Sequence, residues 1–292
     1  MISVIIPAYN EEKRIAETIR ALRDFFDAQD QDFELVVVSD GSYDGTYEAA
    51  KSLEDEKVRV FSYPDNRGKG HALRYGFERS RGDRIVFFDA GLNFPPRQVL
   101  EFLERLNGGR AADSPKPGFG TDLKAWLYSS AAPADIVIGS KRHPDSEVDY
   151  PWRRKLVSLG AQATVKILFN LDITDTQVGL KVFRREVLEK IMPLVLVKRY
   201  AFDIELLALA QRYGFKIIDA PVKLRLKLST AVSPRSLYVT LFDTLAVFYR
   251  LRVLKFYDLT GEEREKLLAN YPVTLIDKVL CFILGDLLGR KS

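Results

Sequence analysis

The first half of the chain alternates short β-branched runs with amphipathic stretches, and this alternation constrains the fold more than any other feature of the sequence. Buried strands are expected at Ile2–Ile6, Leu35–Val38, Val58–Phe61, Ile85–Phe88 and Ile136–Ile138. Helices are expected between them at Glu11–Ala28, Asp44–Leu53, Gly70–Ser80 and Pro96–Leu106. Strands and helices in alternation predict an α/β fold, in which a mostly parallel sheet is flanked by helices.

Composition narrows the class of protein further. Of the 292 residues, 47% are hydrophobic and 29% are charged, which is the balance of a folded globular chain. The formal net charge of +4 is too small to indicate a nucleic-acid partner, so none is expected. The single cysteine, Cys281, excludes an internal disulfide and fits a reducing compartment.

Acidic motifs follow three of the expected strands, at the point where each strand ends. They are Pro7–Glu12, Ser39–Thr46 and Asp89–Asn93. Because the carboxyl ends of parallel strands meet at one edge of a sheet, and ligands bind beyond that edge, these motifs predict a shared cleft. Carboxylates in such a cleft suit ribose hydroxyls, the edge of a base or a divalent cation. A single aspartate there more often caps a turn or a helix, but three motifs in register favour a binding site.

Six motifs, in order along the chain, resemble those of the family 2 glycosyltransferases, which have the Rossmann-like GT-A fold. They are PAYNEE, VVVSDGSYDGT, NRGKGHAL, FFDAGLNFPP, DTQVGLKVF and RYAFDIELL. The last two look like the branch that glycosylates polyprenyl phosphates, which contains the dolichyl-phosphate glucose and mannose synthases. The resemblance runs from about residue 2 to residue 228.

The resemblance assigns one group of residues to the nucleotide-sugar donor. It implies that Pro7, Tyr9 and Glu11 line the nucleoside pocket, that Asp40 contacts the base or the ribose, and that Lys69 lies near the nucleotide. Glycines on both sides of Lys69 permit a close backbone approach, and the start of a helix favours phosphate, so elementary physical chemistry agrees with the assignment.

The expected metal motif departs from the family pattern. The resemblance implies Asp-x-Asp after the fourth strand, whereas this chain has Asp89-Ala90-Gly91. Asp89 is expected to act at the donor and, with the amide oxygen of Asn93, to hold Mg²⁺ or Mn²⁺, with diphosphate oxygens and waters completing the shell. The loss of one carboxylate should weaken metal binding in the absence of nucleotide.

Cationic residues after the fifth strand are the candidates for binding an acceptor phosphate. Ser140, Lys141 and Arg142 follow that strand, and Gln177 is placed near the acceptor by the resemblance. The segment is one residue longer before its arginine than in the family, so either Lys141 or Arg142 could take the catalytic cationic role. A phosphate acceptor is already anionic and needs no general base, whereas a hydroxyl acceptor does, and Asp203 is the candidate for that base.

The main functional hypothesis is an inverting glycosyltransferase. It would move glucose or mannose from UDP-glucose or GDP-mannose to a polyprenyl phosphate carrier, and inversion is implied by the resemblance alone. Two alternatives stay open. One is transfer to a saccharide hydroxyl, and the other is a nucleotide-binding pseudoenzyme with a degenerate metal site, suggested by Gly91.

Residues 1–230 are expected to form the GT-A domain, with a surface loop inserted at 107–133, and residues 231–292 a C-terminal helical region. The amphipathic stretches Leu237–Tyr257 and Val273–Leu288 carry aromatic and basic residues typical of a membrane interface. No stretch reaches the roughly 18 apolar residues of a membrane span. These features predict a cytoplasmic protein attached peripherally to the inner face of a membrane. The alternative is that the same helices pack on the domain or form a homo-oligomer contact.

Overall fold

The structure, a computed structural model, describes residues 1–108, 133–148, 160, 162, 164–171, 173–199, 201–224 and 234–270. Most of the expected surface loop at 107–133, and all of the expected helix at Val273–Leu288, lie outside the described residues. The chain divides into two units, Met1–Ala231 and Val232–Ser292.

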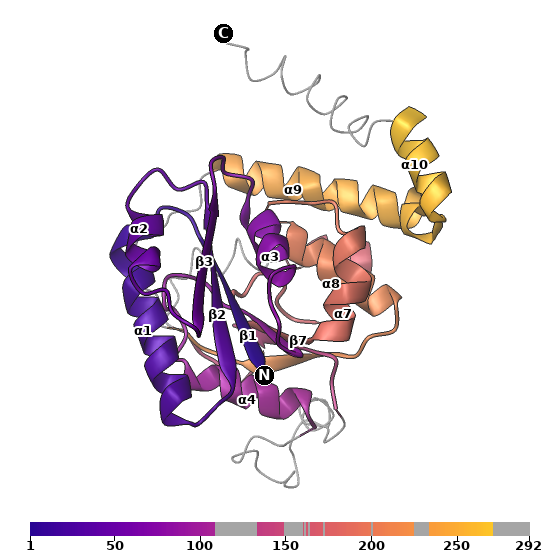
Figure 1. The fold of residues 1–292 in the computed structure, drawn as a ribbon. Helices are drawn as coiled ribbons and strands as arrows, with labels where there is room; N and C mark the ends of the chain where they lie inside the picture. The colour runs from indigo at the N-terminus through magenta and orange to yellow at the C-terminus, as the bar shows by residue number, and fades with distance from the viewer. Residues whose placement is uncertain are drawn as a thin grey trace, which may run out of the picture. The chain divides into compact units, whose positions relative to one another are not determined.

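A seven-stranded sheet, in the order β3-β2-β1-β4-β7-β5-β8, forms the centre of the first unit (Figure 1). Its strands are β1 (Ile2–Ala8), β2 (Phe33–Asp40), β3 (Val58–Tyr63), β4 (Arg84–Phe87), β5 (Ile136–Ser140), β7 (Lys181–Arg184) and β8 (Ile217–Pro221). All pairings are parallel except those of β7, which lies antiparallel between β4 and β5. The mostly parallel sheet predicted from the sequence is therefore confirmed, with one antiparallel strand inside it.

Helices cover both faces of this sheet (Figure 1). The layers are α1 (Glu12–Ala28), α2 (Thr46–Lys51) and α4 (Arg97–Leu106) on one face, and α3 (Lys69–Phe77), α7 (Arg185–Ile191) and α8 (Phe202–Arg212) on the other. Helix α1 buries Ile15, Ile19 and Leu22 because its apolar residues recur at helical spacing. Helix α3 approaches the sheet through Gly76, where a Cβ would lie 2.5 Å from a methyl group of Ile5.

Two smaller elements complete the first unit. A 3₁₀ turn, Met192–Leu194, follows α7 directly. A separate parallel ribbon pairs β6 (Glu147–Val148) with β9 (Lys223–Leu224). This ribbon ties the chain just after β5 to the chain just after β8.

The second unit is helical in its described part. Helix α9 (Pro234–Phe248) runs into a π-helical turn (Tyr249–Val253), which is followed by a 3₁₀ turn (Phe256–Asp258) and α10 (Gly261–Asn270). Thr260 and Glu263 cap α10, since the Thr260 backbone N–H donates to the Glu263 carboxylate at 2.8 Å. Among the described helices, none is both long enough and apolar enough to cross a membrane.

An exposed apolar stripe runs along α9 and the π-helical turn. It consists of Leu241, Leu245, Tyr249 and Val253, whose exposed fractions lie between 36% and 58%. The basic residues Arg252 and Lys255 are exposed beside its C-terminal end. A row of apolar side chains next to cations matches the amphipathic pattern expected from the sequence.

Candidate active site

Three lysine–aspartate ion pairs line the region where β4, β5 and β7 meet. They are Lys69 with Asp89, Lys141 with Asp175 and Lys181 with Asp203, at closest N–O distances of 2.6, 3.4 and 2.9 Å. The first pair is partly exposed and the last is almost completely buried. Each cation thus has a carboxylate partner in the chain, which a substrate phosphate could replace at the more accessible pairs.

Asp89 follows β4 in a turn that is fixed from several sides. The carbonyl of Ala90 accepts a hydrogen bond from the Thr18 hydroxyl of α1 at 2.6 Å. The carboxylate of Asp89 lies against Gly179, where a Cβ would approach Oδ2 to 1.7 Å, so only glycine fits at this position. This contact could not be predicted from the sequence, because the two residues lie far apart along the chain.

Charges around Asp89 keep it ionised. Burial on its own raises the pKa of this carboxyl, but the ammonium groups of Lys69, Lys181 and Lys141 outweigh it and hold the pKa below its ordinary value. Asp89 and Lys69 are in direct contact, whereas Lys141 pairs with Asp175 and acts on Asp89 only through its charge. A shared catalytic role for the three residues stays a prediction.

Gly179→Ala is expected to lower any activity of this site by about a hundredfold, since a shift of about 1 Å in a functional group costs that much. The added methyl group must push the Asp89 carboxylate away, because no other atom is as close to it. Steady-state kinetics measure the effect, and circular dichroism checks the fold. Gly261→Ala is the matched control, since its Cβ meets nothing within 4 Å, and equal losses in both variants would contradict the prediction.

Asp40 anchors the glycine-flanked loop that carries Lys69. Its buried carboxylate accepts hydrogen bonds from the Tyr63 hydroxyl at 2.7 Å and from the backbone N–H groups of Arg67 at 2.8 Å and Gly68 at 3.0 Å. Gly68 has a φ of 97°, and a Cβ there would meet a backbone carbonyl at 2.5 Å. Asp40 therefore fixes the start of α3, while its expected contact with a base or ribose stays a prediction.

The residues at the end of β1 and directly after it lie at the same edge of the sheet as the ends of β2 and β4. Pro7 is partly buried at the end of β1, and Tyr9 is exposed. Burial raises the pKa of Glu11, and the nearby Asp89 and Asp44 add to the rise against the lowering effect of Arg14. Because β1 pairs with β4 in parallel, the ends of these two strands are neighbours, which agrees with the contribution of Asp89 to the raised pKa of Glu11.

Tyr43 lies at this edge and was not predicted from the sequence. It is 84% exposed and packs edge-on against Tyr9, with ring centroids 6.1 Å apart. Its backbone N–H donates to the Asn10 side chain at 3.2 Å, which fixes the loop after β2 to the loop after β1. The sequence feature that could have identified Tyr43 is its position as an aromatic residue within the VVVSDGSYDGT motif.

The four expected acceptor residues follow β5 or lie near it. Ser140 is buried, and its Oγ accepts the backbone N–H of Arg142 at 3.1 Å. The guanidinium group of Arg142 donates to the carbonyl of Thr174 at 2.5 Å, whereas Lys141 is the cation whose charge acts on Asp89. Gln177 is exposed and lies three residues after Thr174, in the segment that precedes β7. The two cations thus have different partners, since Lys141 pairs with Asp175 and Arg142 with the carbonyl of Thr174, and which of them binds an acceptor phosphate stays a prediction.

The expected general base occupies an ion pair. Asp203 and Lys181 are 5% and 1% exposed, and Lys181 also donates to the carbonyl of Val178 at 2.5 Å. Glu205, two residues further along α8, accepts instead the backbone N–H groups of residues 196 and 197. The role of Asp203 as a base for a hydroxyl acceptor stays a prediction.

The chemistry of the residues around Gly91 fits a divalent cation that takes most of its ligands from a substrate. Asp89 offers a carboxylate, and the Asn93 amide group lies next to Gly91, with its oxygen 3.6 Å from where a Cβ would stand. No cluster of three or more acidic, histidine or cysteine side chains suited to a metal exists among the described residues. One carboxylate and one amide oxygen leave room for diphosphate oxygens, which Mg²⁺ and Mn²⁺ accept.

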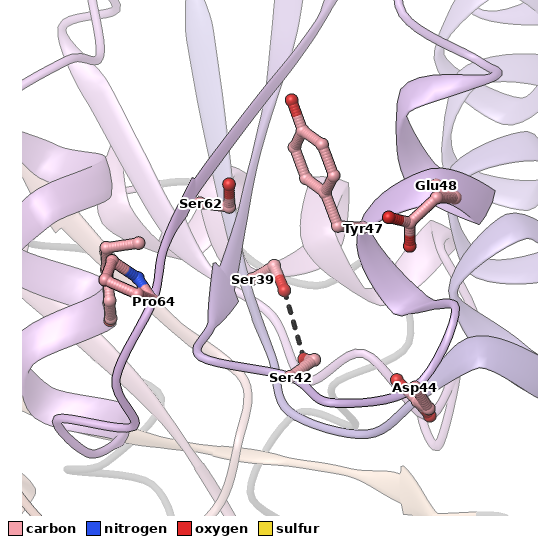
Figure 2. Close-up of a pocket in the computed structure, with 8 residues that line it drawn as sticks. Ser39, Ser42, Asp44, Tyr47, Glu48, Ser62 and Pro64 are labelled. Atoms are coloured by element: carbon pink, nitrogen blue, oxygen red, sulfur yellow. Dashed lines mark hydrogen bonds between the residues drawn. The ribbon is translucent and has the colours of Figure 1, made fainter.

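A pocket of about 420 Å³ lies beyond the ends of β2 and β3, on the face covered by α2 (Figure 2). Its lining is Ser39, Ser42, Asp44, Tyr47, Glu48, Ser62, Tyr63 and Pro64. Since side chains alternate along a strand, Ser39 points away from the face to which Asp40 points. Ser39, Ser42 and Asp44 of the second acidic motif line this pocket, whereas the residues assigned to the donor and the acceptor do not.

Comparison with known proteins identifies the family. The profile described as Glycosyl transferase family 2 matches residues 3–129. Dolichyl-phosphate beta-glucosyltransferase of Homo sapiens is 35% identical over 234 residues, which are 76% of this chain and 66% of that protein. The chain belongs to glycosyltransferase family 2. The resemblance inferred from the six motifs is confirmed.

A second relative of this family 2 chain is Glycosyltransferase AglD of Haloferax volcanii, which is 33% identical over 227 residues. The match covers 76% of this chain and 32% of AglD. The chain thus spans about a third of AglD and just under two thirds of the human protein.

Solved structures confirm the GT-A fold. Glucosyl-3-phosphoglycerate synthase from Mycobacterium tuberculosis, in complex with Mn²⁺, UDP and glucosyl-3-phosphoglycerate, superposes with a TM-score of 0.61 at 22% sequence identity. The superposition covers 85% of this chain and 78% of that one. At this level of identity the similarity establishes the fold alone.

Proposed function

We propose that this family 2 chain transfers a hexose from a nucleotide sugar to a polyprenyl phosphate. The observation that carries the proposal is a pair of partly exposed ammonium groups, Lys69 paired with Asp89 and Lys141 paired with Asp175, whose charges both lower the pKa of Asp89. Two adjacent cations suit a reaction in which both substrates carry phosphate. The names of the relatives, dolichyl-phosphate beta-glucosyltransferases, support glucose as the hexose and the β-linkage that inversion of an α-linked donor gives.

The residues divide the work between the two substrates. Lys69, at the start of α3, holds the donor diphosphate and balances the charge that develops on it as it leaves. Lys141 draws the acceptor phosphate towards the anomeric carbon, and because that phosphate is anionic it attacks without a general base. Asp89 and Asn93 would hold Mg²⁺ or Mn²⁺, whose charge assists departure of the diphosphate.

The deciding experiment offers the full chain radiolabelled UDP-glucose or GDP-mannose, polyprenyl phosphate and Mg²⁺ or Mn²⁺. Label is expected in the organic phase with one of the two donors. Label found on a saccharide instead would favour a hydroxyl acceptor. The absence of transfer from both donors would contradict the proposal.

Gly91 is the observation that favours a pseudoenzyme as the second candidate. A protein of that kind would bind nucleotide through Lys69 without completing a metal site. Calorimetry separates the two functions, because a pseudoenzyme is expected to bind UDP or GDP with an affinity that metal does not increase, and to show no turnover.

We also propose that the exposed stripe on α9 attaches the chain to a membrane surface. Its apolar side chains and the neighbouring Arg252 and Lys255 suit the interface of an anionic bilayer, where a polyprenyl phosphate would be held. The stripe is continuous over Leu241, Leu245 and Tyr249, which follow each other at helical spacing.

Leu241→Glu combined with Leu245→Glu is expected to weaken binding to vesicles of anionic lipid by at least about tenfold, since two buried leucines contribute several times that free energy. Co-sedimentation with vesicles measures the change. Ile167→Glu, at an exposed apolar residue of the first unit, is the matched control. Unchanged vesicle binding together with a loss of self-association in analytical ultracentrifugation would assign the stripe to a second copy of the chain instead.

A further inference from the structure

Lys69 forms an ion pair with Asp89, which is the acidic residue of the Asp89-Ala90-Gly91 motif that could bind a metal ion. Its Nζ lies 2.6 Å from Oδ1 of Asp89. Gly91 has no side chain where the family has the second carboxylate. Among the described residues, no three acidic, histidine or cysteine side chains cluster in a way that could hold a metal ion. In the nucleotide-free chain the charge of Asp89 is therefore balanced by an ammonium group.

A divalent cation and an ammonium group compete for the same carboxylate oxygen, because both need its lone pair and their charges repel each other. Asp89 has little space in which to turn away from Lys69. Gly179 packs against the other side of the carboxylate, so closely that a Cβ there would come within 1.7 Å of Oδ2. A metal ion that takes Oδ1 of Asp89 as a ligand must therefore displace Lys69.

A diphosphate supplies the alternative partner that lets Lys69 move. Lys69 is the first residue of α3, and the backbone N–H groups at a helix start favour phosphate. The same diphosphate brings the oxygen ligands that Asp89 and Asn93 lack for a complete shell. Binding of the diphosphate thus both releases Asp89 and completes the metal site.

We propose that Lys69 makes metal binding conditional on the nucleotide, so that the divalent cation binds Asp89 only together with or after the donor diphosphate. The inference rests on the proposed function in one respect, since it takes the donor to be a nucleotide sugar. Lys69 thereby has two roles, holding the diphosphate when the donor is present and neutralising Asp89 when it is absent.

The test measures Mn²⁺ binding to the full chain by electron paramagnetic resonance, with and without UDP or GDP. The wild-type chain is expected to bind Mn²⁺ at least about tenfold more tightly when nucleotide is present, and Lys69→Met to gain at least about tenfold in nucleotide-free affinity. Lys57→Met is the matched control. It removes an equally short pair, 2.6 Å from Asp27, at the surface, and should leave Mn²⁺ binding unchanged.

A second variant tests the missing carboxylate. A Cβ at Gly91 would meet only the Asn93 amide, at 3.3 to 3.7 Å, so a side chain fits there with small adjustments. Gly91→Asp is expected to raise nucleotide-free Mn²⁺ affinity by at least about tenfold even with Lys69 in place, whereas Gly91→Ala should not. Circular dichroism confirms that each variant folds.

The outcomes separate the inference from the proposed function. Equal Mn²⁺ affinity with and without nucleotide, or no gain in Lys69→Met, would overturn the conditional metal site while sugar transfer could still be observed. Nucleotide-dependent Mn²⁺ binding without any transfer would overturn the proposed function alone. Failure of both UDP and GDP to bind would overturn the two together.

Discussion

Asp89→Asn is expected to lower the rate of sugar transfer by about a hundredfold to a thousandfold, the effect of removing one electrostatic group from the reacting centre. Asparagine keeps the shape of aspartate, so it still fits against Gly179. It has lost the negative charge that positions Lys69 and attracts a divalent cation, and the motif has no second carboxylate to compensate. The measurement is transfer of label into lipid under conditions that saturate the wild-type enzyme.

The surface pair of Asp27 and Lys57 provides the control for this loss. Asp27→Asn removes a carboxylate whose distance to its lysine is also 2.6 Å, and surface pairs contribute little to stability or activity. Transfer by Asp27→Asn should stay within about twofold of the wild type. If Asp89→Asn kept a comparable rate, Asp89 would have no essential part in the reaction.

Lys181→Met is expected to reduce the free energy of unfolding by about 3–5 kcal/mol, because it leaves the carboxylate of Asp203 buried without its cation. The pair is 2.9 Å apart, and both side chains are at most 5% exposed. For a chain of this size, such a loss corresponds to a melting temperature about 6 to 20 °C lower. Urea denaturation and thermal unfolding, each followed by circular dichroism, measure it.

Combining Lys181→Met with Asp203→Leu should recover most of the lost stability, since two apolar side chains can replace a buried ion pair at little cost. A single variant as stable as the wild type would show that the pair does not support the fold. A further variant at Asp203 tests whether the acceptor is a phosphate or a hydroxyl. Loss of transfer in Asp203→Asn without loss of stability would instead support Asp203 as a general base for a hydroxyl.

The parallel strands and their helices could be predicted because their signals are local. Continuous apolar runs such as Leu35–Val38 mark strands buried on both faces, and they appear within β2 as expected. The direction and position of β7 could not be predicted in this way. Its four residues begin with a lysine, and its neighbours β4 and β5 both precede it by many residues.

In the candidate site, too, the features with local sequence signals could be predicted and those that depend on tertiary packing could not. Asp89 and Lys69 could be placed together because one follows a strand and the other opens a helix at one edge of the sheet. The partners that hold them could not, since Asp40 meets the loop before α3, and Gly179 meets Asp89, only through tertiary packing. The type and order of the residues predict which edge of the sheet carries the functional side chains, whereas tertiary packing determines how each of these side chains is oriented.

The late position of β7 has a consequence for synthesis of the chain. Strands β1 to β4 can pair with one another as soon as they emerge, but β4 and β5 have no link until residues 181–184 arrive between them. Until then β4 is an open edge that can pair with other chains. Insertion of β7 closes a long loop and is expected to be slow. The strands that carry the residues assigned to the donor can therefore form first, and the two halves of the proposed site come together only once β7 has paired.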